Sequence, residues 1–400
     1  MSTFNRRNFL KSSLIGASGI LVPGTAKAGG AKAGRAGKAP EMITRTLGNT
    51  GIELPVLSMG VMRADNPNLV KAAYDAGIKH FDTAHGYQRG KNEEMLGEFF
   101  KDKPRDSFTI TTKVVPPGID RRTGKLGPDF TKEGFLELAE LSLQRLQMDH
   151  VDFFLHHLAS SRETLLNEGM LSALRQLKQE GKAKYLGVST HKNQAEVIRA
   201  AIEGGVHEVV VVAINFTMKD NQDLMDAIEE GASAGLGFIA MKTMAGGFHD
   251  EEKKIPVNGV AALKWVLENP HITTIIPGFT QFHELQTDLE IMNGLEMTDE
   301  ERENLLAGGG RSGFYCNGCT GCQQQCRRNL PVSDLMRAYM YTYAYGNLEK
   351  GREILDEYGV DADPCKGCPG CTVTCSSGFA VAERIAKVSR LKDVPEDFIT

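Results

Sequence analysis

The chain has 400 residues, 41% of them hydrophobic, which is enough for one large domain and a smaller one and argues against a disordered protein. The formal net charge of −5 comes with no basic stripe, so we expect small molecules or proteins as partners and no nucleic acid. All eight cysteines lie in the last quarter of the chain, which separates that part from the rest.

The N-terminal residues are typical of an export signal. The sequence NRRNFLK, residues 5–11, resembles the twin-arginine motif, and a mildly apolar run over 12–22 and the small-x-small sequence AKA at 26–28 follow it. The apolar run is too short and too rich in Gly and Ser to span a bilayer stably. A frayed basic tail is the alternative. We expect a signal peptide over 1–28, a flexible linker over 29–44, the twin-arginine export machinery as a partner, and a periplasmic protein that is exported already folded around a cofactor.

From residue 45 onward, strand-like apolar runs alternate with helix-like segments. We expect strands near 56–60, 80–84, 108–114, 151–157, 183–190, 208–215, 237–243 and 273–279. Helices are expected between them, such as 132–146, 168–179, 194–203, 220–233 and 260–268. Eight such units within about 250 residues predict an α/β fold, a (β/α)8 barrel over 45–308. A doubly wound sheet is the alternative, but no Gly-x-Gly-x-x-Gly follows the first strand.

Reactive side chains fall at the predicted carboxyl ends of three strands. Asp82 ends the second strand, Lys113 ends the third and His157 ends the fourth, while Tyr87 follows Asp82 in the loop above. The carboxyl ends of barrel strands form one rim, where barrel enzymes keep their active sites. Each residue alone could be structural, as a helix cap, a surface lysine or a core histidine. Four compatible groups on one rim favour an active site.

The barrel region resembles the aldo-keto reductase family over nearly its whole length. The matching segments are RTLGNTGIELPVLSMG, FDTAHGY, KNEEMLGEF, TTKV, VDFFLHHL, GKAKYLGVSTH, GFIAMKTMAGG and ITTIIPGFT. The resemblance implies an NADP or NAD cofactor across the barrel mouth and a small-molecule carbonyl or alcohol substrate, for which a sugar is plausible. The family's catalytic tetrad would be Asp82, Tyr87, Lys113 and His157. Family spacing from Asp152 selects His157, and strand alternation sends His156 to the other face.

The implied roles agree with the chemistry of hydride transfer. A carbonyl that accepts hydride needs a proton on its oxygen, and a free tyrosine with a pKa of about 10 is poorly matched to that task at neutral pH. We expect Tyr87 to donate the proton and the Lys113 ammonium to bring its pKa nearer to neutrality. Asp82 would hold Lys113, and His157 would orient and polarise the carbonyl.

The resemblance also assigns cofactor contacts. Ser189 and Asn215 would meet the nicotinamide, and Gly278, Phe279 and Thr280 would meet the phosphates after the eighth strand. Three departures leave the choice between NAD and NADP open. Residues 209–214 contain no Gln, Ile214 stands where relatives often have Tyr, and Gln281 replaces a common basic residue, so that His283 is the nearest cation. The loops 116–128 and 246–256 are expected to border the mouth.

Two cysteine runs follow the hinge at 308–310, each with the spacing C-x2-C-x2-C-x3-C by which bacterial ferredoxins hold 4Fe-4S clusters. The first run is Cys316, Cys319, Cys322 and Cys326, and the second is Cys365, Cys368, Cys371 and Cys375. Resemblance to two-cluster ferredoxins implies crossed sets, in which Cys375 joins the first three cysteines of the first run and Cys326 joins those of the second. Neither Cys326 nor Cys375 is followed by the usual Pro. Structural zinc and disulfides are the alternatives, although zinc prefers two separated pairs and cysteines this close bridge poorly.

We therefore expect an iron-sulfur, ferredoxin-like, helix-rich domain over 309–400, with a helix over part of 332–358 and a last helix over 381–391. A stripe of Met and Tyr in the first of these segments is more typical of packing than of function.

Two functions are compatible with these patterns. In the first, the barrel is an oxidoreductase and the clusters exchange electrons with a redox protein partner. Hydride moves two electrons together and a 4Fe-4S cluster moves one, and no flavin motif is present to couple them. In the second, the scaffold is a binding or redox-sensing protein in which the clusters are structural. The complete tetrad favours the enzyme.

Overall fold

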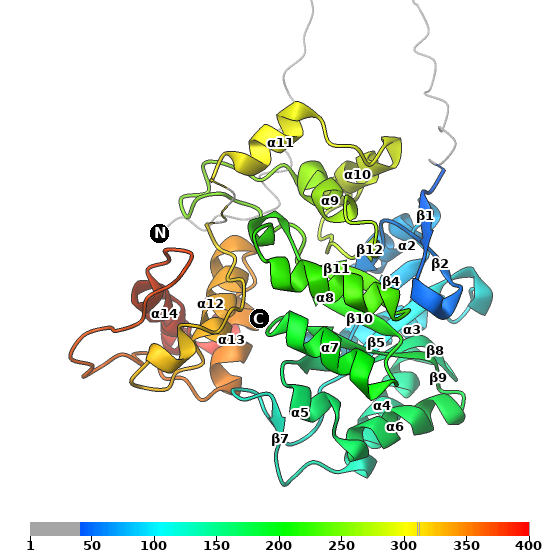
Figure 1. Ribbon diagram of the computed structural model, residues 1–400, viewed down its shortest axis with the longest axis horizontal. Coiled ribbons are helices and arrows are strands. Elements are labelled where there is room, and N and C mark those ends of the chain that lie inside the picture. The colour runs from blue at the N-terminus through cyan, green and yellow to red at the C-terminus, as the bar shows by residue number, and fades with distance from the viewer. Residues whose placement is uncertain (1–40, 310, 312, 400) are drawn as a thin grey trace, which may run out of the picture. The chain divides into compact units, whose positions relative to one another are not determined.

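The computed structural model of the chain describes residues 41–309, 311 and 313–399. The expected signal peptide, most of the expected linker and Gly310 of the hinge lie outside these residues. Within them, the chain first forms a parallel sheet surrounded by helices and then a group of helices that carries the cysteines (Figure 1).

The sheet has eight parallel strands in the order β12-β11-β10-β9-β8-β5-β4-β3. Their bounds are β3 (Met59–Gly60), β4 (His80–Asp82), β5 (Thr109–Val114), β8 (Val151–Ala159), β9 (Ala183–Thr190), β10 (Val209–Ala213), β11 (Gly237–Met241) and β12 (Ile272–Ile275). The two outer strands also meet, because Leu57 pairs with Ile275 and the Gly60 N–H donates to the Pro277 carbonyl at 2.9 Å. The sheet is thus a nearly closed barrel, as predicted, and the doubly wound alternative is excluded.

Helices follow the strands and cover the outside of the barrel (Figure 1). They are α2 (Pro67–Asp75), α3 (Lys91–Phe100), α4 (Lys132–Leu146), α5 (Arg162–Leu165), α6 (Glu168–Gln179), α7 (Gln194–Gly204), α8 (Gln222–Ser233), α9 (Gly259–Leu267), α10 (Phe282–Asp288) and α11 (Asp299–Leu306). Polar caps define several starts, since Thr131 accepts from the Gly134 N–H at 3.1 Å and Asn167 accepts from the Met170 N–H at 3.1 Å.

Two short antiparallel pairs were not predicted. β1 (Thr44–Thr46) pairs with β2 (Glu53–Pro55) before the barrel, and β6 (Ile119–Asp120) pairs with β7 (Lys125–Leu126) in the loop after β5. Leu54 of β2 packs with buried side chains of the barrel interior.

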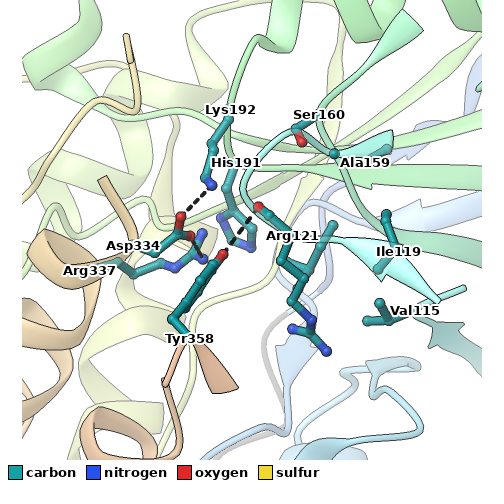
Figure 2. Close-up of a pocket in the computed structure, with 12 residues that line it drawn as sticks. Val115, Ile119, Arg121, Ala159, Ser160, His191, Lys192, Asp334, Arg337 and Tyr358 are labelled. Carbon is teal, nitrogen blue, oxygen red and sulfur yellow. Dashed lines mark hydrogen bonds and ion pairs between the residues drawn. The ribbon is translucent and has the colours of Figure 1, made fainter. Parts of the chain in front are cut away.

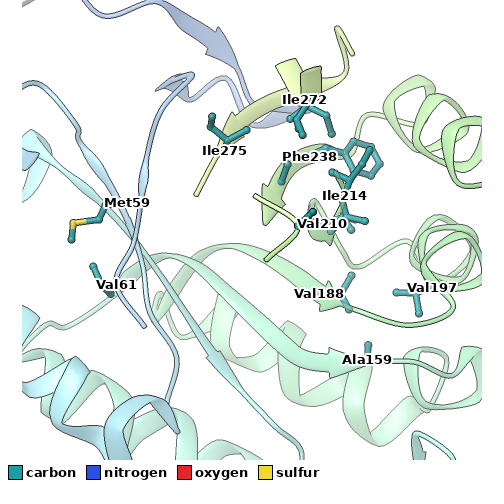
Figure 3. Packing of buried hydrophobic residues seen from close by; sticks show 14 of the residues in the cluster. Met59, Val61, Ala159, Val188, Val197, Val210, Ile214, Phe238, Ile272 and Ile275 are labelled. Carbon is teal, nitrogen blue, oxygen red and sulfur yellow. The ribbon is translucent and has the colours of Figure 1, made fainter. Parts of the chain in front are cut away.

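The core has two parts, which follow from the alternation of side chains along each strand. Val209 and Val211 of β10 face the barrel interior, where they pack with Phe153 and Ile239. Val210 and Val212 face outward into the layer between strands and helices. Figure 3 shows part of this outer layer. A fully buried aliphatic or Phe side chain contributes about 1.5–3 kcal/mol, so the core fixes the strand ends rigidly in place.

The C-terminal part is helical, and no strand follows β12 among the described residues. It consists of α12 (Val332–Tyr339), a π-helical turn (Met340–Ala344), α13 (Leu348–Glu357) and α14 (Val381–Ser389). Figure 1 shows α12, α13 and α14 together beside the barrel. Arg384 of α14 donates from Nε to Glu251 Oε1 at 2.6 Å and from Nη2 to the Gly313 carbonyl at 2.6 Å, which ties the last helix to a barrel loop. None of the described helices is long and apolar enough to cross a membrane.

Candidate active site

Three strand ends and one loop bring the predicted tetrad together. Asp82 is the last residue of β4, Lys113 lies near the end of β5 and His157 lies in β8. Lys113 Nζ donates to Asp82 Oδ1 at 2.6 Å and to the Thr83 carbonyl at 2.6 Å. The ring of Tyr87 packs edge-on against His157, with 5.8 Å between centroids, and Lys113 Nζ is 5.1 Å from the centre of the Tyr87 ring.

The Asp82–Lys113 pair is almost completely buried, with side chains 4% and 1% exposed. Burial lowers the pKa of Lys113 and raises the pKa of Asp82, and the attraction between the two partly offsets both effects. Asp82 Oδ2 has no hydrogen-bond partner among the described residues, and Asp82 lines the cavity described below.

The pKa of Tyr87 differs from the sequence expectation. Burial raises it well above 10, and the nearby Asp82 carboxylate and Tyr341 raise it further. The Lys113 ammonium does not reverse this, because it already donates to Asp82 and Thr83. Tyr87 is therefore a neutral phenol, which suits a proton donor.

A cavity of about 170 Å³ opens above the tetrad. Asp82, Tyr87 and His157 line one side of it, whereas Lys113 lies beneath and does not. Gly278 lines another side, at the end of β12. Arg121 comes from the loop expected to border the mouth. The cavity thus joins the predicted catalytic residues to part of the predicted cofactor site.

Much of the remaining cavity wall was not anticipated from the sequence. Arg63, His191 and Lys242 come from loops of the barrel, and Arg337, Tyr341, Tyr345 and Lys350 come from the C-terminal helices. Lys242 Nζ donates to the Tyr341 hydroxyl at 2.6 Å, so the two parts of the chain share the cavity. No sequence pattern marked these residues, because the Met and Tyr stripe consists of others, of which Met336, Tyr339 and Met340 are buried as predicted.

The two adjacent histidines lie in different environments. His157 lines the cavity, and its pKa is well below 6.5 because of burial and nearby cations, Lys113 first among them. Both ring nitrogens of His156 lack partners among the described residues, and burial lowers its pKa to about 3. His157 can act as a neutral hydrogen-bond donor in the cavity, whereas His156 is part of the protein interior.

The expected nicotinamide contacts are already engaged within the protein. Ser189 Oγ accepts from the Leu158 N–H at 3.2 Å. Asn215 Nδ2 donates to the Lys242 carbonyl at 3.1 Å. Both residues are fully buried, and neither lines the cavity above the tetrad.

The expected phosphate contacts differ among themselves. Gly278 lines the cavity, but the Phe279 side chain is buried in the core. The Thr280 and Gln281 N–H groups donate to one Glu284 carboxylate oxygen at 2.6 and 2.9 Å. The chain's own carboxylate therefore occupies the Thr280 N–H, at a residue expected to meet a phosphate, whereas Gly278 still lines the cavity.

The eight cysteines form no disulfides. Among the described residues, no three His, Cys, Asp or Glu side chains converge closely enough to hold a single metal ion. The two runs nevertheless lie against each other, since Thr372 Oγ1 donates to the Gln325 carbonyl at 2.7 Å and the Thr374 N–H donates to Gln325 Oε1 at 2.7 Å.

The last cysteine of each run lies close enough to thiols of the other run to affect their pKa values. Burial, together with the nearby Cys322, Cys319 and Cys375, raises the pKa of Cys316 to about 12. Burial also raises the pKa of Cys365, with added contributions from Cys371, Cys326 and Cys368. Cys326 lies near Cys322 as well. Each run therefore lies beside the last cysteine of the other.

Comparison with known proteins identifies the barrel. The sequence profile described as Aldo/keto reductase family matches residues 57–260. An L-glyceraldehyde 3-phosphate reductase of Escherichia coli (strain K12) is 24% identical over 322 residues, covering 65% of this chain and 90% of that protein. An L-galactose dehydrogenase of Arabidopsis thaliana is 25% identical over 300 residues, covering 65% and 91%. The solved holo form of an aldo-keto reductase from Bacillus halodurans has the same fold, with a TM-score of 0.56 and 19% identity, covering 69% of this chain and 98% of that one.

Proposed function

The chain belongs to the aldo/keto reductase family and is an NAD(P)-dependent oxidoreductase, and on that premise we propose that it transfers hydride between the nicotinamide and a sugar-like carbonyl or hydroxyl. The observation that carries this proposal is the convergence of Asp82, Tyr87 and His157 on one cavity above buried Lys113. The names of the relatives, a glyceraldehyde phosphate reductase and a galactose dehydrogenase, support a sugar-like substrate.

The residues divide the work of the reaction. A bound nicotinamide supplies or receives the hydride. Tyr87, a neutral phenol, donates its proton to the carbonyl oxygen during reduction, and neutral His157 donates a hydrogen bond to the same oxygen. The Lys113 ammonium, 5.1 Å from the centre of the ring, would stabilise the phenolate left behind, and Asp82 holds that ammonium in place. The C-terminal helices wall the cavity and exclude water.

The substitution Tyr87→Phe tests the tetrad. We expect kcat for carbonyl reduction to fall about 10²–10⁴-fold, the usual contribution of a positioned acid, with little change in cofactor affinity measured by fluorescence quenching. Tyr185→Phe is the matched control, because the Tyr185 hydroxyl donates to the Thr50 carbonyl and Tyr185 does not line the cavity. Reduction by Tyr87→Phe at the normal rate would contradict the assignment.

We also propose that the cysteines hold two 4Fe-4S clusters that exchange electrons with a redox protein partner. One cluster would take Cys316, Cys319, Cys322 and Cys375, and the other would take Cys365, Cys368, Cys371 and Cys326. The crossed electrostatic neighbours support these sets. A cubane of four irons also keeps its thiolate ligands farther apart than a single ion does, so the absence of a one-ion site among the described residues does not oppose it.

Analysis of anaerobically purified protein for iron and acid-labile sulfide tests the clusters, and a colourless protein without sulfide would contradict them. Bleaching of the visible absorption when substrate is added would support electron exchange with the barrel. Unchanged absorption during nicotinamide turnover would instead make the clusters structural.

Export to the periplasm by the twin-arginine route is a further proposal, supported by the sequence NRRNFLK. The paired change Arg6→Lys and Arg7→Lys should retain the protein in the cytoplasm of a bacterial host with this pathway, as measured by cell fractionation. Unchanged export of that variant would count against the route.

A further inference from the structure

We propose that the substrate of this cavity carries an anionic group, a carboxylate or a phosphate ester, which a cationic wall of Arg63, Lys242 and Arg337 binds. The inference rests on the proposed function, because it assigns a substrate class to the same cavity. Arg63 and Lys242 belong to barrel loops and Arg337 to α12, so the wall forms where the C-terminal helices meet the barrel mouth.

Two cations of this wall have no acidic partner within the part of the chain that the structure describes. Among the described residues, neither Arg63 nor Lys242 lies within ion-pair distance of a carboxylate. Arg63 donates from Nη2 to the Tyr345 carbonyl at 2.9 Å, and its guanidinium carbon lies 5.1 Å from the centre of the Tyr345 ring. An arginine has five N–H donors in a planar fork, so most of its capacity is left for a carboxylate or phosphate.

The same side of the cavity has more cations than carboxylates. In a smaller adjoining pocket, which shares Arg337 and His191 with the cavity and is shown in Figure 2, Asp334 is shared by Lys192 and Arg337. Arg121 pairs with Glu357, and Lys350 pairs with Glu353. One carboxylate therefore serves two cations at Asp334, and Arg63 and Lys242 pair with none among the described residues. The wall keeps a net positive charge.

The positive charge lowers the pKa values of two titratable side chains that line the cavity, His191 and Tyr341. Burial lowers the pKa of His191 well below 6.5, and the cations Arg337 and Lys242 lower it further. Tyr341 is equally buried, which raises its pKa, yet Lys242, Arg337 and Lys350 together bring it below 10. The potential near the C-terminal helices is therefore positive and favours a negative group.

The wall beside the tetrad has a different electrostatic environment from the wall beside Tyr341. Tyr87 faces the Asp82 carboxylate, and its pKa is raised where that of Tyr341 is lowered. A substrate with a neutral carbonyl at Tyr87 and His157 and an anionic group toward Arg63 matches both sides. A neutral substrate would offer no anionic group to the remaining N–H donors of Arg63 and Lys242.

Matched substrates test the inference. D-glucose, D-glucuronate and D-glucose 6-phosphate would be compared at saturating cofactor in the wild type, Arg63→Gln and Lys242→Gln. We expect kcat/KM for at least one anionic substrate to exceed that of D-glucose at least tenfold, and expect each variant to reduce this ratio about tenfold. The glucuronate and phosphate arms distinguish a carboxylate from a phosphate ester. Arg175→Gln on α6 is the control, because it removes a positive charge from the outer surface.

Equal kcat/KM for neutral and anionic substrates would overturn the inference and leave the proposed function intact. A variant effect confined to the KM of the cofactor would also overturn it, because the cations would then serve the cofactor phosphates. If the wild type turns over none of the three sugars, the proposed sugar chemistry fails. Binding of the same sugars, measured as a shift in melting temperature, then tests the anionic site alone. Stabilisation by glucuronate or glucose 6-phosphate that Arg63→Gln abolishes would support it, and no stabilisation by either would refute it.

Discussion

Removing the cation of the buried Asp82–Lys113 pair, by Lys113→Met, should destabilise the protein in a pH-dependent way. Methionine keeps the length and apolar stem of the side chain but not its charge, so Asp82 loses its 2.6 Å partner. The other Asp82 oxygen already lacks a partner among the described residues. The variant therefore contains a carboxylate that is almost completely buried and unpaired.

Breaking a buried ion pair by removing one partner costs about 3–5 kcal/mol, and we expect Lys113→Met to lower the free energy of unfolding by this amount at pH 8. Burial already raises the pKa of Asp82, and the loss of Lys113 raises it further. A carboxyl whose folded pKa lies above its unfolded pKa stabilises the fold below the unfolded pKa, and this contribution is lost as the pH rises through the folded pKa. The cost should therefore be smaller at pH 5 than at pH 8.

Urea denaturation at both pH values, followed by circular dichroism, measures the effect. The double variant Asp82→Asn with Lys113→Met should recover part of the loss at pH 8, since it removes the unpaired charge. A cost below about 1 kcal/mol that does not change with pH would refute the reasoning, because it would mean that water reaches the pair.

Three further outcomes are expected. Glu284→Ala should lower the free energy of unfolding by about 1–2 kcal/mol in urea denaturation, because Thr280 and Gln281 lose the carboxylate that accepts their N–H groups, and an unchanged value would argue against this cap. Asp288 has its pKa raised to about 8 by burial and by Glu284, so its contribution to stability should disappear as the pH rises through 8, and Asp288→Asn should flatten the melting temperature measured from pH 6 to pH 9. Arg384→Met should speed proteolytic removal of the C-terminal helices by trypsin several-fold, because the buried guanidinium loses Glu251 and the Gly313 carbonyl, and unchanged cleavage would show that other contacts hold α14.

The barrel was predictable because its strands are short apolar runs that end in polar residues. α4 and α6 have the predicted bounds, and Thr131 and Asn167 explain why, since each caps the first turn of its helix. The last strand ends at Ile275, earlier than the predicted 279, because Pro277 lacks the N–H that would continue the ladder. The pairs β1–β2 and β6–β7 were missed because two or three residues carry no readable periodicity.

The tetrad could be located from sequence because each member follows or ends a strand of the same barrel. The pKa of Tyr87 could not be predicted, since it depends on Lys113 being committed to Asp82 and Thr83. The cationic wall of Arg63, Lys242 and Arg337 could not be predicted from the sequence either. Lys242 and Tyr341 are separated by 99 residues, and no local pattern brings them together.

The stripe that includes Met336, Tyr339, Met340 and Tyr343 packs as predicted up to the π-helical turn. A stripe at ordinary helical spacing predicts that all its members pack on one side, and Met336, Tyr339 and Met340 are indeed buried. The wider turn over Met340–Ala344 shifts the following positions around the axis, so that Tyr343 is exposed and Tyr341 faces the cavity.

The contact between Arg63 and Tyr345 also bears on how the protein is made. The two residues are 282 positions apart, and a ribosome that adds about 5–20 residues per second needs roughly 15 to 55 seconds to pass from one to the other. The strands β4 to β12 are synthesised within that interval, and the C-terminal part of the cavity wall follows them. A chain released before Tyr345 would keep the tetrad beneath an open mouth, so completion of translation itself determines when the cavity first closes around a ligand.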